Sequence, residues 1–352
     1  MININRKKTK EIKIGNIYLG GNNPIYIQSM CNTDTKDIKS TVNQILALEE
    51  AGCEIIRVAV LDMQSAFAIK DIKKQINIPI VADIHFDYRL ALECIASGVD
   101  KIRINPGNIG DESRIKKIVD KAKERNIAIR IGVNSGSLEK NIIQMYNGVT
   151  SKGLVESALN NINILEKYNF ENIIVSIKAS SVPLSIESYS MLSEKIDYPI
   201  HLGITEAGTI WRGTIKSSVG IGTILSKGIG DTIRVSLTGD PIEEIYCAKE
   251  ILKSLCLRKF GIEFISCPTC GRTKIDLISI AREIEDKCKH INKNITVAIM
   301  GCAVNGPGEA KEADIGIAGG IGEGVIFKKG KVLRKVKEYE LVSELMKEIE
   351  NL

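Results

Sequence analysis

The sequence predicts an α/β protein in which a (β/α)8 barrel, a TIM barrel, is followed by a small α+β domain. Eight short β-branched apolar runs, amphipathic helical stretches between them and a change of pattern after Cys256 carry this prediction. With 352 residues, the chain has room for a barrel of about 250 residues and a further domain of about 100. We expect the barrel over residues 1–257 and the second domain over residues 258–352.

The eight apolar runs recur at nearly regular intervals through the first part of the chain. They cover residues 25–30, 55–60, 78–84, 101–106, 127–133, 172–180, 199–205 and 232–238. The stretches between them place apolar residues at the i, i+3, i+4 spacing of helices. Eight strand–helix repeats are typical of a closed parallel barrel, whose strands are buried on both faces. An open doubly wound sheet is disfavoured, because no G-x-G-x-x-G turn follows the first run.

Two further segments flank this pattern. We expect a short hairpin around Gly15 and Asn16 that closes the bottom of the barrel. After Cys256 the order becomes strand, cysteine pair, helix, strand, glycine-rich loop, two more strands and a terminal helix, which indicates a separate α+β domain.

Composition excludes several functional classes. A net charge of +5 is too small an excess to indicate a nucleic-acid partner, whereas it suits a small anionic substrate. The N-terminus lacks the apolar stretch of a secretory signal, and no run reaches membrane-spanning length, so we expect a cytoplasmic protein. Nine cysteines in a reducing compartment should then be thiols or metal ligands.

Five of the predicted barrel strands carry a basic residue inside the apolar run. They are Arg57, Arg103, Arg130, Lys178 and Arg234. Any one of them alone could form a private ion pair or reach solvent. Barrel active sites form at the C-terminal ends of strands, where five cations can converge on a doubly phosphorylated ligand.

Other polar residues near the same strand ends complete the predicted mouth of the barrel. They are Asp83, His85, Asn105, Asn134, Ser176, His201, Thr205 and Glu206. A lone histidine is more often structural than catalytic, so a structural role is the alternative for both His85 and His201. Glu206 is the best carboxylate for proton transfer because it ends a strand beside small residues. A charge at a helix N-terminus, stabilised by the helix dipole, explains Glu206 equally well.

Three cysteines of the second domain indicate a metal centre. Cys267 and Cys270 form a C-P-T-C pair between a strand and a helix, and Cys302 precedes an Asn-Gly-Pro-Gly turn. This spacing suits zinc or an iron–sulfur cluster, and a thioredoxin-like dithiol is a third option that Cys302 disfavours. A closed zinc site needs a fourth strong ligand, for which Cys288 and His290 are nearest. Glu309 could instead supply an oxygen ligand to one iron.

The other cysteines are expected to be buried small apolar residues. They are Cys31, Cys53, Cys94, Cys247 and Cys256. Cys31 ends the first barrel strand and stays a minor candidate for the site.

Seven motifs together resemble those of the 4-hydroxy-3-methylbut-2-en-1-yl diphosphate synthases. They are QSMCNTDT, ADIHFD, KIRINPGN, IRIGVNSGSL, LGITEAG, SCPTCGR and GCAVNGPGEA, in order along nearly the whole chain. The resemblance implies an iron–sulfur oxidoreductase of the methylerythritol phosphate route to isoprenoids. Its substrate would be 2-C-methyl-D-erythritol 2,4-cyclodiphosphate, opened with two electrons and loss of water. Reduced flavodoxin or ferredoxin would supply the electrons.

The resemblance also implies roles for particular residues. Cys267, Cys270, Cys302 and Glu309 would hold a [4Fe-4S] cluster in a sulfite/nitrite reductase-like domain, and Glu309 would share the catalytic role with Glu206. The residues implied or expected to bind the substrate are Arg57, His85, Arg103, Arg130, Asn134, Lys178, Thr205, Arg234, Ser236 and Asn305. Such enzymes are homodimers in which the cluster domain of one subunit caps the barrel of the other. The extra domain of plant-type members is absent.

Other functional classes remain open from the residues alone. One is a zinc-stabilised barrel enzyme acting on a phosphorylated small molecule, or an aldolase-like enzyme with Lys178 as Schiff base. The other is a metal-bearing RNA-binding protein, which the small charge excess disfavours.

Overall fold

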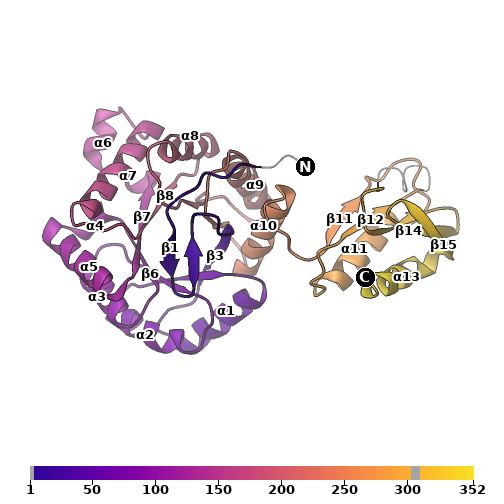
Figure 1. Cartoon of the computed structure of the whole chain (residues 1–352), viewed down its shortest axis with the longest axis horizontal. Coiled ribbons are helices and arrows are strands. Elements are labelled where there is room, and N and C mark those ends of the chain that lie inside the picture. Colours follow the sequence, from indigo (N-terminus) through magenta and orange to yellow (C-terminus); the bar gives the residue numbers. More distant parts are fainter. Residues whose placement is uncertain (1–3, 303–309) are drawn as a thin grey trace. The chain divides into compact units, whose positions relative to one another are not determined.

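The computed structural model describes residues 4–302 and 310–352, and the chain divides into two compact units between Arg258 and Lys259. The first unit is a parallel barrel with helices outside it, and the second holds a separate five-stranded sheet (Figure 1). The predicted fold class is therefore confirmed. None of the helices in the described residues combines the length and the apolar character needed to cross a membrane.

Each of the eight predicted apolar runs contains one barrel strand. The strands are β3 (Tyr26–Met30), β4 (Ile55–Ala59), β5 (Ile80–Asp83), β6 (Lys101–Ile104), β7 (Ala128–Asn134), β8 (Ile173–Lys178), β9 (His201–Leu202) and β10 (Thr232–Ile233). All neighbours are parallel, and β10 pairs with β3. A parallel bridge between Val175 and Ile200 joins β8 to the segment of β9 and closes the barrel.

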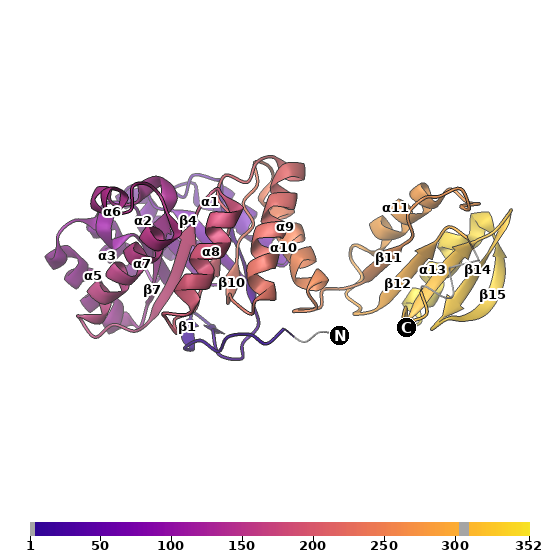
Figure 2. The ribbon, with the colours of Figure 1, turned by 90° about the horizontal axis from the view of Figure 1, so that it is seen from above.

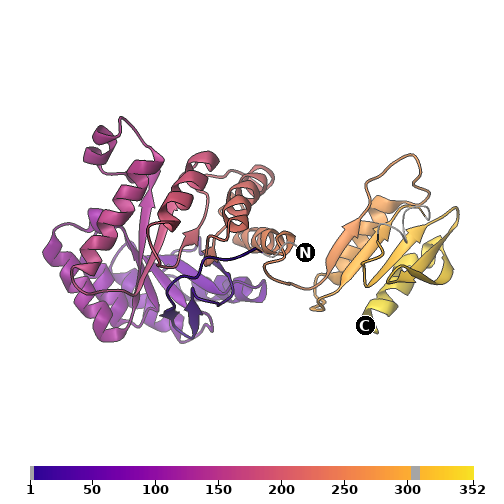
Figure 3. The same cartoon turned by 45° about the horizontal axis from the view of Figure 1, so that its top comes forward.

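Helices surround the barrel (Figure 3). They are α1 (Ile38–Glu50), α2 (Met63–Lys73), α3 (Tyr88–Ala96), α4 (Pro106–Ile109), α5 (Glu112–Arg125), α6 (Lys140–Met145), α7 (Ser151–Glu166), α8 (Val182–Ser193), α9 (Ile210–Ser226) and α10 (Pro241–Ser254), with a 3-10 turn at Ser135–Ser137. Several begin at an aspartate, such as Asp37, Asp62 and Asp111, whose side chain accepts a hydrogen bond from a free backbone N–H of the first turn.

A hairpin seals one end of the barrel. Strands β1 (Ile12–Ile14) and β2 (Ile17–Leu19) pair antiparallel around the predicted turn. The hairpin residues Ile12, Ile14 and Leu19 pack in one apolar cluster with residues at or near the starts of four barrel strands: Ile55, Val81, Ala128 and Ile174. Figure 1 shows β1 inside the ring of helices, and Figure 2, seen across the barrel, shows it at one end. The predicted closure of the barrel bottom is confirmed, and polar chemistry is left to the opposite end.

Within the residues that the structure describes, the second unit is a mixed sheet with two helices packed against it. Its order is β11 (Glu263–Ser266), β12 (Thr296–Met300), β13 (Ile315–Gly319), β14 (Glu323–Lys328) and β15 (Lys331–Lys337), with the last two pairings antiparallel. The helices are α11 (Leu277–Cys288) and α13 (Leu341–Glu350), which follows a 3-10 turn at Glu338–Glu340. Their apolar faces share one core with the sheet. Because β11 and β12 are parallel neighbours, the loops that follow them leave the same edge of the sheet.

Candidate functional site

A cavity of about 310 Å³ opens at the C-terminal ends of the barrel strands. Twelve residues line it: Arg57, Asp83, His85, Arg103, Arg130, Asn134, Ser176, Lys178, Thr205, Glu206, Arg234 and Ser236. All five basic residues predicted from the strands converge here. Of the polar residues predicted for the mouth, only Asn105 and His201 do not line the cavity.

Positive charge exceeds negative charge in this cavity. Among the lining residues, five are Arg or Lys and only Asp83 and Glu206 are acidic. Burial, together with the charges of Arg57 and Arg130, holds the pKa of Lys178 well below its usual value. Burial also lowers the pKa of Arg57 to about 10, although Asp83 opposes that change. Burying several positive charges in one cavity costs free energy, and a bound anion would offset that cost. The cavity is therefore a candidate anion-binding site.

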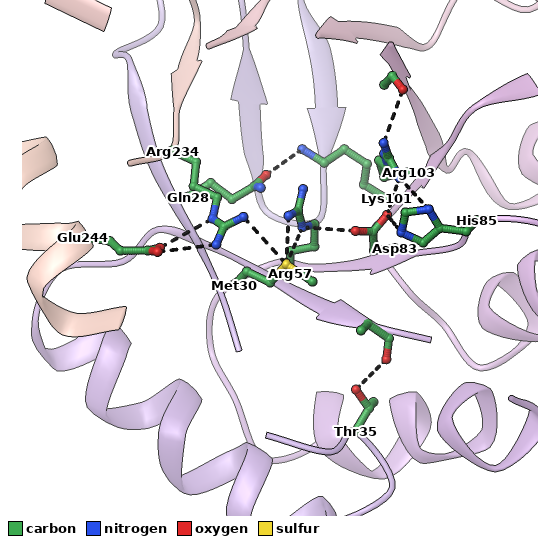
Figure 4. Close-up of polar contacts among 12 residues, drawn as sticks. Gln28, Met30, Thr35, Arg57, Asp83, His85, Lys101, Arg103, Arg234 and Glu244 are labelled. Carbon is green, nitrogen blue, oxygen red and sulfur yellow. Dashed lines mark hydrogen bonds and ion pairs between the residues drawn. The ribbon is translucent and has the colours of Figure 1, made fainter. Parts of the chain in front are cut away.

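Asp83 holds two of the guanidinium groups. One carboxylate oxygen, Oδ1, accepts a hydrogen bond from Arg103 Nη1 at 3.1 Å, and the other lies 3.5 Å from Arg57 Nε. Burial alone would raise the pKa of Asp83, but the charges of Arg57 and Arg103 outweigh it and lower the pKa to about 2. The ring of His85 lies beside the same pair, 3.4 Å from Arg103 Nη1 (Figure 4). Asp83 is therefore ionised throughout the neutral range and aligns Arg57 with Arg103.

Arg103 lies against the backbone of strand β7. Its Nη2 donates to the carbonyl oxygen of Gly132 at 3.3 Å, and the Asn134 amide oxygen, when turned toward Arg103, accepts from Nη2 at 3.0 Å. A Cβ atom at Gly132 would lie 2.5 Å from Arg103 Nε. Glycine at this position thus leaves the space that the guanidinium occupies.

Arg130 is the most deeply buried cation of the cavity, with 1% of its surface exposed. Its Nε and Nη1 find no hydrogen-bond partner within the part of the chain that the structure describes. Buried guanidinium groups are normally paired, so these two donors are suited to a ligand that brings its own acceptors.

Below the cavity lies a polar layer that sequence reasoning only partly anticipated. Lys101 is fully buried and its Nζ lies 3.5 Å from Gln28 Oε1 (Figure 4). Burial and the neighbouring arginines lower its pKa strongly. Like Arg103, Lys101 is a basic residue in an apolar run. The same sequence signal could therefore have identified it. His201 belongs to this layer: its Nδ1 lies 2.8 Å from Thr232 Oγ1.

The structure corrects several other expectations. Asn105 is the N-cap of α4, where its side chain accepts from Gly107 N. Cys256 is exposed rather than buried, because it follows the end of α10 in a left-handed turn with φ +53°. Two residues that contact the arginines were not predicted: Met30, which contacts Arg57 and Arg234, and Glu244, which contacts Arg234. Glu244 has the sequence context of an ordinary helix start, so no sequence signal identified it.

Glu206 occupies the loop between β9 and α9. Its φ is +53°, in the left-handed region that is unfavourable for residues other than glycine. Helix α9 begins at Ile210 after the N-cap Thr209, and its first turn contains no acidic residue. Glu206 lies three residues before the N-cap, which disfavours the alternative that it is a charge at a helix N-terminus stabilised by the helix dipole. An exposed carboxylate held in a strained backbone at a cavity is typical of a functional residue.

The cysteine loops of the second unit lie at one edge of its sheet. The Sγ of Cys267, which follows β11, accepts a hydrogen bond from Gly301 N at 3.1 Å, and Gly301 is next to Cys302. Hydrogen bonds from the backbone and side chain of Arg272 lower the pKa of the exposed Cys270 thiol. Thiolate character is what a metal ligand requires.

Two predicted residues of this loop region, Asn305 and Glu309, lie outside the described residues. Within residues 4–302 and 310–352, no three His, Cys, Asp or Glu side chains are grouped so as to hold a metal ion. Cys288, the nearest candidate for a fourth zinc ligand, is buried with its Sγ 3.7 Å from Met346 Sδ. That contact disfavours the closed zinc site.

The contact between Gly132 and Arg103 generates a prediction. Gly132→Ala should leave the barrel folded, because the clashing atoms belong to the movable end of a long side chain. It should weaken the binding of inorganic pyrophosphate about tenfold, the size expected when one charge-assisted hydrogen-bonding group is displaced. Isothermal titration calorimetry measures this. Gly136→Ala is the control, since a Cβ there meets nothing within 4 Å among the described residues. Equal affinity in both variants would contradict a role for Arg103 in anion binding.

Comparisons with known proteins agree with this arrangement. The family described as "GcpE TIM-barrel domain" matches residues 9–249, and "GcpE protein C-terminal domain" matches residues 263–351. Among solved structures, a dihydropteroate synthase from Xanthomonas albilineans has a TM-score of 0.51 at 11% identity. It covers 70% of this chain and 98% of that one, and it shows the fold alone.

Curated relatives match over almost the full length. A protein of Caldanaerobacter subterraneus is 64% identical over 99% of this chain and 98% of its own length. One of Clostridium perfringens is 63% identical over 99% of this chain and 100% of its own length. Both are named 4-hydroxy-3-methylbut-2-en-1-yl diphosphate synthase (flavodoxin). The cationic barrel cavity, the thiol loops and these matches lead to one conclusion: the chain belongs to the GcpE family of 4-hydroxy-3-methylbut-2-en-1-yl diphosphate synthases.

Proposed function

We propose that this chain, an iron–sulfur oxidoreductase, opens 2-C-methyl-D-erythritol 2,4-cyclodiphosphate at the barrel cavity. Two electrons and two protons are consumed, the ring C–O bond to phosphate breaks, and water leaves to give (E)-4-hydroxy-3-methylbut-2-en-1-yl diphosphate. The observation that carries the proposal is the convergence of five cations on one cavity of about 310 Å³. A volume of this size suits a small molecule rather than a polymer.

The lining residues divide the work of binding. Arg57, Arg103 and Arg130 present planar donor groups that suit phosphate oxygens, and Lys178 adds a point charge. Arg234 and Ser236 approach from the end of β10, while Asn134, Thr205 and His85 offer neutral or polar contacts at the mouth. A diphosphate fixed in this way leaves the carbon skeleton oriented toward the open end of the barrel.

We also propose that Cys267, Cys270, Cys302 and Glu309 hold a [4Fe-4S] cluster, with Asn305 reaching the substrate. The donor set fits: three thiols come from two adjacent loops, Gly301 N already donates to Cys267 Sγ, and the pKa of Cys270 is lowered. When bound, the cluster would supply electrons one at a time at low potential. A carboxylate in place of a fourth thiolate would make one iron exchangeable, which is the catalytic role given to Glu309.

The partners follow from the same family. Relatives carry flavodoxin in their names, so reduced flavodoxin, or ferredoxin, is the proposed electron donor. Large apolar side chains are exposed around the barrel mouth, among them Leu61 at 78%, Phe86 at 71% and Trp211 at 77%. Apolar residues around a charged opening suit a covering protein surface. They support a homodimer in which the cluster domain of one subunit caps the barrel of the other. A cytoplasmic location is a separate part of the proposal.

The proposed role of Glu206 is to donate a proton to the departing hydroxyl. Glu206→Gln should lower kcat by about a hundredfold or more, because a general acid contributes at least that much. Its KM should change little, since glutamine keeps the size and polarity of the side chain. An anaerobic assay with the cyclodiphosphate and a chemical reductant measures both constants, with the exposed Glu187→Gln as control. Full turnover of Glu206→Gln would remove this role.

Substrate affinity should fall as the pH rises toward the usual pKa of lysine, about 10.4. In the free cavity the pKa of Lys178 is well below its usual value, and a bound diphosphate raises it. Binding therefore takes up a proton wherever Lys178 is neutral in the free protein. The cyclic diphosphate has no proton that titrates in this range, so the dependence reports on the protein. Calorimetry of Lys178→Met should show weaker binding with a flatter pH profile. A profile as steep as that of the unchanged protein would contradict the assignment.

The metal content separates the proposed cluster from zinc. Anaerobic purification followed by iron and acid-labile sulfide analysis should give about four of each per chain. Cys267→Ser should lose most of both, whereas Cys288→Ala, which removes a buried thiol of the same unit, should keep them. Stoichiometric zinc without sulfide would reject the cluster and favour the zinc-stabilised barrel enzyme.

A further inference from the structure

We infer that Glu244 is a positioning residue that fixes the guanidinium of Arg234 at the edge of the cavity. The inference rests on the function proposed above, in which Arg234 binds the diphosphate. Glu244 lies in the first turn of helix α10, outside the barrel strands, and does not line the cavity. Its side chain is nevertheless buried, with 4% exposed. A buried carboxylate at a helix start requires partners that offset its desolvation.

The contacts of Glu244 join three separate segments. Its Oε1 accepts from Leu237 N at 3.0 Å and lies 3.5 Å from Arg234 Nη2. Its Oε2 accepts from Ser29 Oγ at 3.1 Å and lies 3.5 Å from Arg234 Nε. The backbone and hydroxyl donors hold the carboxylate in place, so that its two oxygens face the Nε–Nη2 edge of the guanidinium (Figure 4).

Arg234 needs such an anchor because its other neighbours repel it or attract it weakly. Its Nη1 lies 3.8 Å from Met30 Sδ, and the same sulfur accepts from Arg57 Nε at 3.0 Å and Nη2 at 2.8 Å. Two guanidinium groups thus share one neutral sulfur atom. Asp83 offsets the charge of Arg57, and Glu244 does the same for Arg234. Without Glu244, repulsion from Arg57 favours other rotamers of Arg234.

Charge and position make opposite predictions for the loss of this carboxylate. If Glu244 acted only through the net charge of the cavity, its neutralisation would make the cavity more positive and strengthen the binding of an anion. If Glu244 orients Arg234, neutralisation weakens binding, because a guanidinium that is free to rotate gives up its hydrogen bonds to phosphate. The sign of the change in affinity therefore decides between them.

The experiment measures the affinity of the full-length, anaerobically purified protein for the cyclodiphosphate by calorimetry without reductant. Glu244→Gln keeps the length of the side chain and an acceptor for Leu237 N, and should bind about tenfold more weakly. KM should rise by a similar factor, with a smaller change in kcat. Glu243→Gln is the matched control: it removes a neighbouring charge from the same helix turn and should leave affinity unchanged.

Two further variants test whether the effect runs through Arg234. Glu244→Asp keeps the charge but shortens the side chain, and should also weaken binding, which a pure charge effect would not do. In an Arg234→Gln background, Glu244→Gln should cause no further loss, because the group it orients is gone. Thermal unfolding of each variant shows whether the fold is intact, and Glu244→Asp serves if Glu244→Gln does not fold.

The outcomes separate this inference from the proposed function. Unchanged or tighter binding by Glu244→Gln, or an additional loss of full size in the Arg234→Gln background, would overturn the positioning role while the binding site stands. Unchanged affinity in both Arg234→Gln and Arg57→Gln would instead contradict the binding site itself, and the inference with it.

Discussion

Positive charge that is buried without an equal amount of negative charge is the condition on which the rest of the barrel depends. Arg57, Arg103 and Arg130 are all nearly inaccessible to water, and the carboxylate of Asp83 offsets only part of their charge. Water would relieve the repulsion, but the apolar packing of the hairpin excludes it from the other end. Binding of an anion lowers the free energy of the same arrangement. The folded protein thus lacks negative charge in the cavity, and the ligand supplies it.

Small details around the cavity serve this arrangement. Gly132 leaves space for one guanidinium, and Met30 separates two others with a polarisable but uncharged atom. Asp83 contacts both Arg57 and Arg103, and Glu244, which is held by Leu237 N and Ser29 Oγ, contacts Arg234. None of these residues needs to touch the substrate. Together they convert a set of flexible side chains into a fixed array, which is what selective binding and positioning of a diphosphate require.

The sequence was sufficient to predict the architecture and the basic residues of the cavity. It was insufficient to predict how deep each side chain lies in the barrel and which residues hold the arginines in place. Short, nearly continuous apolar runs with helices between them identify all eight strands, and a charge inside such a run identifies Arg57 or Arg103 without further information. The pattern cannot say that Lys101, two residues before Arg103 on the same face of the strand, lies one layer deeper, because depth depends on strand tilt and register. It cannot show that Glu244 reaches across to Ser29, since that contact joins segments far apart in the chain. The cap formed by Asn105 is a local contact with Gly107 N, so the sequence around it carried that information.

The hairpin of β1 and β2 determines where substrate enters the barrel and where product leaves it. In the part of the chain that the structure describes, this hairpin closes the end of the barrel opposite the cavity. Substrate, product and displaced water then use the same opening, and product must leave through it before the next substrate can bind. If the capping arrangement proposed above forms, the same contact would control both the exclusion of water during reduction and the release of product.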